Sequence, residues 1–174
     1  MALPRRRPQP DPAEGLAPNG RPRESVWDYP RPPRIEPEDR RVRGQLGGTQ
    51  IADSARAVRV LETAGAPVVY LPPEEIMPGA IEPVRGSTYC EWKGTATYYD
   101  AVAGGQRAGR AAWGYLDPTG PFAAIAGFIS FYPALVICRL GDERVLPQPG
   151  GFYGGWVTAE ITGPIKGEPG SLLW

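Results

Sequence analysis

The chain has 174 residues, of which 41% are hydrophobic, and its 19 cationic side chains balance 19 carboxylates. This length favours one domain, and the apolar share is enough for a packed core. The 23 glycines and 22 prolines argue against a helix bundle, because both residues are costly inside helices. The composition predicts a mainly β fold: a compact single domain of antiparallel strands, β-tent or barrel-like, with one or two short helical turns.

Charge and the rarity of metal-binding side chains narrow the function classes. Ten of the 17 arginines lie before residue 44, so no basic stripe covers the body and we expect no nucleic-acid partner. The chain has no histidine, and its only cysteines are Cys90 and Cys138. Zinc sites and histidine-based catalysis are therefore excluded. We expect no metal site and no cofactor, although a magnesium ion held by carboxylates stays open.

The same features predict a cytoplasmic location. Two cysteines do not form a disulfide scaffold, and free thiols fit a reducing compartment. No apolar run approaches the roughly 18 residues of a membrane span, so no membrane partner is expected. The basic, proline-rich N-terminus is not followed by the apolar region of a signal peptide. The oligomeric state stays open.

The first part of the chain differs from the rest in composition. Residues 1–24 are rich in proline and arginine and are expected to form a disordered tail, with a docking arm as the alternative. Residues 25–174 are expected to form the single β-rich domain. The segment 25–30 contains Trp27 and Tyr29, whose exposure would be costly, so it should lie against the body as an ordered arm.

The strands of the body are expected in the following order. Residues 42–53 predict a hairpin with a turn at Gly47-Gly48, followed by a strand or short helix over 55–63, a strand over 68–71 ended by Pro72-Pro73, and a helical turn over 74–77. The longest β-prone run, 88–103, ends at Gly104-Gly105, and 107–115 should return antiparallel. A helical start at 122–125, a strand over 128–132 and a strand over 136–140 complete the series.

The run 88–103 is expected to be the central strand and sorts its side chains onto two faces, because the period of a strand is two. One face is small and aromatic and is expected to be core; it contains Cys90, Trp92, Gly94, Ala96 and Tyr98. The other is polar and contains Glu91, Lys93, Thr95, Thr97 and Tyr99.

The polar face has two interpretations. It is either a solvated surface with a weak Glu91–Lys93 pair, or the wall of a pocket in which Lys93 is a phosphate clamp or a nucleophile tuned by Glu91. The chain has 17 arginines but only two lysines, Lys93 and Lys166, and this bias favours a dedicated role for a lysine. Lys93 and Glu91 are the candidate catalytic residues, whereas Cys90 is expected to be a buried, inert thiol.

A second unusual segment is the glycine-aromatic run 149–156. Its paired glycines can bring backbone N–H groups close to an anion while aromatic rings stack on a flat ligand, or they can form a turn that covers the core. The candidate ligand-binding residues of the chain are Trp92, Thr95, Tyr153 and Trp156.

Three stretches resemble a known family. Residues 25–30, the Cys-x-Trp-Lys-Gly element within 88–96, and 123–133 are similar to the bacterial domain-of-unknown-function 427 family, over about residues 25–174. The resemblance implies a compact, mainly β domain. The family is sometimes labelled nucleotidyltransferase-like.

Three functions follow as hypotheses. The first is a module that binds a small anionic ligand, a nucleotide being the simplest candidate, at the Glu91/Lys93 face. The second is a nucleotidyltransferase-like enzyme that uses Lys93 as nucleophile or acid/base. The third is a protein-interaction module whose tail docks on a partner.

Overall fold

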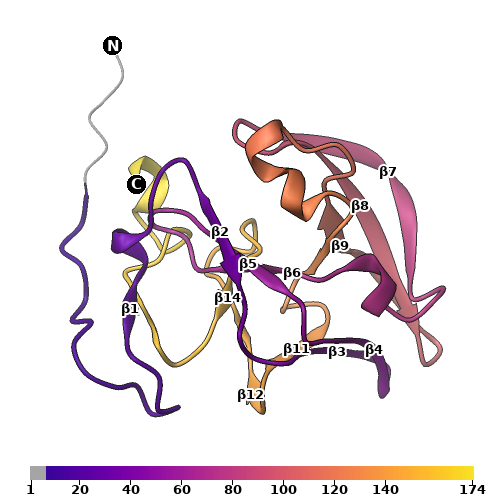
Figure 1. Cartoon of the computed structure of the whole chain (residues 1–174), viewed down its shortest axis with the longest axis horizontal. Helices are drawn as coiled ribbons and strands as arrows, with labels where there is room; N and C mark the ends of the chain where they lie inside the picture. Colours follow the sequence, from indigo (N-terminus) through magenta and orange to yellow (C-terminus); the bar gives the residue numbers. More distant parts are fainter. Residues whose placement is uncertain (1–6) are drawn as a thin grey trace.

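The structure of the chain is a computed structural model that describes residues 7–174. Strands dominate this part, and the three sheets of three or four strands are antiparallel throughout. Figure 1 shows a long twisted ribbon of β7, β8 and β9 on one side of the molecule and the C-terminus with strand β1 on the other. No helix within residues 7–174 is long and apolar enough to cross a membrane. The expected mainly β class is confirmed.

The three larger sheets carry the longer strands. The ribbon sheet has the order β10-β9-β8-β7, with β7 at Ile81–Cys90, β8 at Gly94–Ala103, β9 at Gln106–Gly114 and β10 at Ile129–Phe131. The second sheet has the order β12-β11-β3-β4, with β3 at Val42–Leu46, β4 at Thr49–Ser54, β11 at Ile137–Leu140 and β12 at Glu143–Arg144. The third has the order β2-β5-β6, with β2 at Arg34–Pro37, β5 at Val58–Leu61 and β6 at Val68–Tyr70.

Short elements complete the fold. Strand β13 (Leu146–Pro147) pairs with β14 (Trp156–Val157), and β1 (Glu24–Ser25) runs parallel to β15 (Ile161–Thr162). The helices are 3-10 turns: η1 at Val26–Asp28, η2 at Pro73–Glu75, η3 at Gly120–Ile125 and η4 at Ser171–Leu173. No sheet in the described part of the chain closes on itself, so the barrel-like alternative is wrong. Many strands here are two to four residues long, and sheets of such strands stay small and open.

Most of the strands expected from the sequence are present. The hairpin of β3 and β4 turns at Gly47-Gly48, where both glycines have positive φ. The run 55–63 contains β5 and is therefore strand rather than helix, and the helical start before β10 is η3. The ordered arm is confirmed as well: Trp27 is buried and donates its indole N–H to the Pro164 carbonyl at 2.9 Å.

The run 88–103 is not one strand. It bends back at residues 91–93, so that β7 pairs with β8 in a hairpin closed by Cys90 and Gly94. Gly94 has φ of +96°, a conformation that favours glycine, and this residue allows the chain to reverse. The two-face assignment is therefore wrong across the turn, because the alternation of a strand stops at Cys90.

The N-terminal segment contacts the body along much of its described length. Residues 1–6 lie outside the described residues, so the expected disorder concerns only 7–24 here. Asp11 donates its backbone N–H to the Gly163 carbonyl at 2.8 Å, and Asn19 donates through its side chain to Glu143 at 2.7 Å and Glu160 at 2.8 Å. These bonds argue against a free tail over residues 11–24.

The buried polar residue Glu160 organises this end of the molecule. Its carboxylate accepts hydrogen bonds from Arg40 Nη1 at 2.8 Å and from Asn19. Arg40 also contacts the buried Glu38 through Nε at 2.8 Å, and Arg21 Nε lies 3.6 Å from Glu160. We call these five side chains the Glu160 network. It ties the N-terminal segment to the loop before β15.

Two hairpin turns lie back to back in the body. Gly47 joins β3 to β4, Gly104 joins β8 to β9, and both have positive φ. A Cβ on Gly104 would overlap the Gly47 carbonyl, and a Cβ on Gly47 would lie 2.7 Å from the Ala103 carbonyl oxygen. Only glycine fits at both turns, and their contact joins the ribbon sheet to the second sheet.

Candidate functional site

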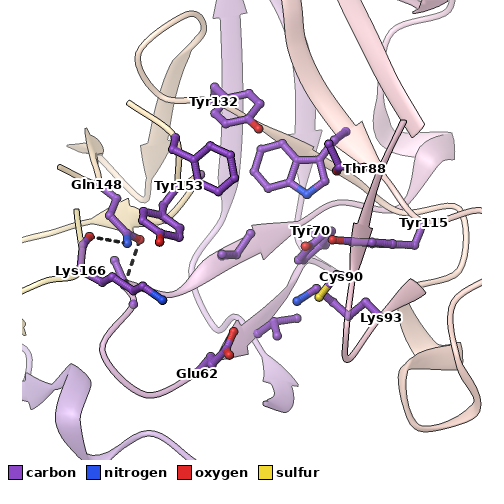
Figure 2. A pocket seen from close by; sticks show the side chains of 18 of the residues that line it. Glu62, Tyr70, Thr88, Cys90, Lys93, Tyr115, Tyr132, Gln148, Tyr153 and Lys166 are labelled. Carbon is purple, nitrogen blue, oxygen red and sulfur yellow. Dashed lines mark hydrogen bonds between the residues drawn. The ribbon is translucent and has the colours of Figure 1, made fainter. Parts of the chain in front are cut away.

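A cavity of about 680 Å³ lies between the tip of the β7–β8 hairpin, strands β5 and β6, and the glycine-aromatic segment (Figure 2). Segments that are distant in the sequence meet there: Tyr70 ends β6, Lys93 lies in the β7–β8 turn, and Tyr153 and Lys166 come from the C-terminal loops. Its size is typical of a small-molecule site.

The turn at 91–93 directs Lys93 into this cavity. The residue is 8% exposed, and its Nζ lies 5.7 Å from the ring centre of Tyr115 and 5.9 Å from that of Phe122. The turn is fixed by Thr119, whose hydroxyl donates to the Trp92 carbonyl and whose backbone N–H donates to the Lys93 carbonyl at 3.2 Å. Within residues 7–174, Lys93 has no carboxylate partner, so its charge is available to a ligand.

Lys166 reaches the same space from the opposite side (Figure 2). Its backbone N–H donates to the Ala64 carbonyl at 2.8 Å, and its carbonyl accepts a hydrogen bond from the Gln148 side chain, also at 2.8 Å. The Nζ lies 5.3 Å from the ring centre of Tyr153. The only two lysines of the chain therefore line one cavity.

The charged lining of the cavity is predominantly positive. It comprises Arg31, Lys93, Arg110 and Lys166 against one acid, Glu62. The Glu62 carboxylate accepts a hydrogen bond from Trp92 Nε1 at 3.1 Å and lies 3.8 Å from Arg31 Nε. Because these contacts already satisfy Glu62, the remaining field of the cavity favours an anion.

Two buried hydroxyl groups lie beside Lys93. Tyr70 is 1% exposed and Tyr115 6% exposed, and Figure 2 shows both hydroxyls directed into the cavity near the Cys90 thiol. Burial raises the pKa of both phenols, so they keep their protons at neutral pH. Neither of these hydroxyls is hydrogen-bonded to a carboxylate of residues 7–174, where the tyrosine with such a bond is Tyr29.

The rest of the wall is aromatic. The rings of Trp113 and Tyr132 lie 4.4 Å apart between centres, and burial raises the pKa of Tyr132 to about 12 with a further contribution from Tyr98. Gly154 packs on Trp113 so closely that a Cβ there would overlap the indole ring. Flat ring surfaces of this kind suit the organic part of a ligand.

The structure separates the residues that the sequence had grouped. Lys93 and Tyr153 line the cavity. Glu91 is exposed in the turn and Thr95 is exposed on β8, and neither lines the cavity. Trp92 lies outside the lining and acts on it only through its bond to Glu62.

Trp156 is a core residue. It is 1% exposed, and its indole N–H donates to the Phe131 carbonyl at 3.0 Å. Its aromatic neighbours in the sequence suggested a ligand contact, but its position on β14 turns the ring away from the cavity and into the main core. Tyr153 is the member of that segment which faces the cavity.

The two cysteines differ. Cys138 is buried as expected, and burial raises the pKa of its thiol. Cys90 is only half-buried and lines the cavity, so the expectation of a thiol enclosed in the core is wrong. The reason is the turn that follows it, which places Cys90 at the end of β7 and not in the middle of a packed strand.

Several cavity residues were not among the candidates from the sequence. Lys166 had a signal in the scarcity of lysine, but its loop carries no motif. Tyr70 and Trp113 belong to ordinary strand patterns, Tyr115 directly follows β9, and Glu62 directly follows β5. Only the tertiary arrangement brings these side chains together.

Comparison with known proteins gives one result. No curated protein matches the chain. The family model described as a domain of unknown function (DUF427) matches residues 34–140, more than half of the chain. This stretch includes the turn that carries Lys93 as well as Tyr70 and Tyr115, whereas Tyr153 and Lys166 lie beyond it. The chain belongs to the DUF427 family.

Proposed function

We propose that the cavity binds a small organic anion, a nucleotide being the simplest candidate. One observation carries the proposal: both lysines of the chain line the cavity and neither has a carboxylate partner within residues 7–174. A buried ammonium without a counter-ion is unfavourable unless something else compensates its charge. A bound anion between Lys93 and Lys166 supplies that compensation.

The use of arginine elsewhere in the chain supports this reading. Nine arginines form ion pairs in the described part of the chain. Arginine is thus the cation that stabilises the fold through paired, often forked contacts, and lysine is reserved for the cavity. The single acid of the lining is already bonded by Trp92 and Arg31, so it does not neutralise the lysines.

The aromatic wall supports a ligand with a flat organic part. Trp113 and Tyr132 offer ring faces in the same cavity as the two ammonium groups, and Tyr153 lies next to Lys166. A nucleotide combines a flat base with an anionic phosphate and fits a cavity of about 680 Å³. We also propose a cytoplasmic location, because both cysteines are free thiols and such thiols fit a reducing compartment.

Thermal unfolding in the presence of nucleoside monophosphates and of inorganic phosphate tests the proposal. Saturation at 100 times the dissociation constant should stabilise the native protein by about 2.7 kcal/mol, seen as a rise in Tm. Lys93→Met keeps most of the side-chain volume, removes the charge and should abolish the rise. Arg144→Gln removes one cation from an exposed site outside the cavity and should leave the rise intact. Equal loss in both variants, or no rise in the wild type, would refute the proposal.

An enzyme that uses Lys93 is the second candidate. The observation in its favour is the closeness of Lys93 to the two tyrosine hydroxyls and to the Cys90 thiol inside one cavity. Glu91 has no part in it, because its side chain is exposed in the turn. Intact-mass measurement after incubation with a nucleoside triphosphate tests transfer of a nucleotidyl group to Lys93; an unchanged mass contradicts that form of the enzyme.

A further inference from the structure

We propose that Lys93 forms an imine with the carbonyl group of an anionic aldehyde or oxo acid bound in the cavity. This inference rests on the proposed function, because the anionic part of the substrate has to be held by the cations of the cavity. It adds a covalent step and assigns separate roles to the two lysines. Lys166 and Arg31 hold the anionic group, and Lys93 reacts.

The surroundings of Lys93 resemble those of nucleophilic lysines. Such lysines lie in desolvated pockets or beside another cation. Lys93 is 8% exposed, faces the rings of Tyr115 and Phe122, and shares its cavity with Lys166. No carboxylate of the described residues binds its ammonium group, so no ion pair has to be broken before the amine can react.

The two hydroxyls beside Lys93 supply the proton transfers that imine formation needs. The unprotonated amine of Lys93 attacks the carbonyl carbon, and the carbonyl oxygen takes a proton from Tyr115 or Tyr70. The nitrogen then returns one proton to the phenolate, and the re-formed phenol protonates the new hydroxyl group. This group leaves as water as the C=N bond forms, and the last proton on the nitrogen goes back to the phenolate. The step consumes one amine and one carbonyl, releases one water and needs no oxidant or reductant. Burial raises the pKa of both phenols, so each enters the step with its proton in place, and the phenolate formed by the transfer is a strong enough base to take a proton back from the nitrogen.

The chain itself makes the experiment unusually clear. Its only primary amines are Lys93, Lys166 and the N-terminus. Lys93 is buried and Lys166 is half-buried, so accessibility alone predicts that Lys166 reacts before Lys93. If Lys93 reacts first, the order of reaction is the reverse of the order of accessibility. Binding of the probe and activation of Lys93 in the cavity would explain this reversal.

Pyridoxal 5'-phosphate is a suitable probe, because it combines an aldehyde, a phosphate and a flat ring. The full chain is incubated with one equivalent of the probe, reduced with borohydride, and analysed by intact mass and peptide mapping. We expect one adduct, on Lys93. An adduct spread over all amines, or one confined to Lys166 or the N-terminus, overturns the inference, as does the absence of an adduct.

Matched variants separate this inference from the proposed function. Lys93→Arg keeps the positive charge and removes the nucleophile, so it should lose the adduct while phosphate still raises Tm. Arg144→Gln, at an exposed site outside the cavity, should keep the adduct on Lys93. Tyr115→Phe should slow adduct formation by about a hundredfold without changing the response to phosphate. If phosphate raises the Tm of the wild type but no adduct forms on Lys93, only the imine is refuted; if neither occurs, the proposed function fails too.

Discussion

The Glu160 network and the cavity both bury cationic side chains, but they treat them in opposite ways. In the network, the Arg40 guanidinium is clamped between Glu38 and Glu160 with contacts of 2.8 Å to each. In the cavity, Lys93 and Lys166 face open space and aromatic rings instead of acids. In the Glu160 network the protein itself balances the cationic charge, whereas in the cavity no carboxylate of residues 7–174 balances the charge of the two lysines.

This difference underlies our proposal that the network serves stability and the cavity serves a ligand. A buried charge with a full set of partners holds segments together, since removing one partner leaves the other uncompensated. A buried charge without a partner lowers the stability of the empty protein and raises its affinity for a counter-ion. The two regions should therefore respond differently to the removal of a cation.

The largest effect is expected for Arg40→Met. The substitution leaves the buried carboxylates of Glu38 and Glu160 without their main cation and should cost about 3–5 kcal/mol in the free energy of unfolding. Lys93→Met removes an equally enclosed cation that has no acid beside it, so the free energy should change by less than about 1.5 kcal/mol. Urea unfolding of both variants measures the contrast. Comparable losses would show that the two sites are not different in kind.

An intermediate effect is expected at the aromatic wall for Gly154→Ala. The added Cβ would overlap the Trp113 ring, and moving that ring should cost about 1–3 kcal/mol and narrow the cavity. Gly120→Ala is the control, because nothing lies within 4 Å of a Cβ at that position and its φ is not positive. Urea unfolding, together with the Tm response to phosphate, checks both. A normal response to phosphate in Gly154→Ala would remove Trp113 from the binding wall.

The smallest effect concerns acid pH. Burial raises the pKa of Glu160, but hydrogen bonds from Thr158 and Asn19 and the charge of Arg40 outweigh it and lower the pKa below the ordinary 4.5. Below that pH the unfolded chain takes up a proton that the native Glu160 refuses, so stability falls as the pH drops toward the lowered pKa. Glu160→Gln should lessen this fall. The slope of unfolding free energy against pH below 4.5 measures it, and an unchanged slope contradicts the role given to Glu160.

Hydrophobic alternation and glycine pairs were enough to predict much of the fold. The turns at Gly47-Gly48 and Gly104-Gly105 and the strands between them follow from local sequence. The prediction of one strand over 88–103 failed because the reversal of the chain there depends on a contact from a distant residue. Glu91, Trp92 and Lys93 carry no turn-forming residue, and the reversal depends on Gly94 together with the bonds from Thr119, which is distant in the chain.

The candidate site could be predicted only in part for the same reason. The scarcity of lysine pointed to Lys93, and the glycine-aromatic segment pointed to Tyr153, and both line the cavity. The pairing of Glu91 with Lys93 was wrong for the cavity, because it assumed the two-residue period of a strand and these residues lie in a turn. Tyr70 and Tyr115 could not be found, because they are buried residues of apolar sequence patterns and their hydroxyls meet only in the folded cavity.

The contact between the Gly47 and Gly104 turns has a consequence for changes of length in this protein. Hairpin turns are ordinarily where a chain accepts extra residues, such as an epitope or a reporter. Here the two turns pack directly against each other, so that a Cβ on Gly104 would overlap the Gly47 carbonyl. An insertion into the β3–β4 loop has to push away the β8–β9 hairpin, whose strand β8 continues from the Lys93 turn. An insertion into the β8–β9 loop has to push away the β3–β4 hairpin. Neither loop is therefore a suitable place for added residues.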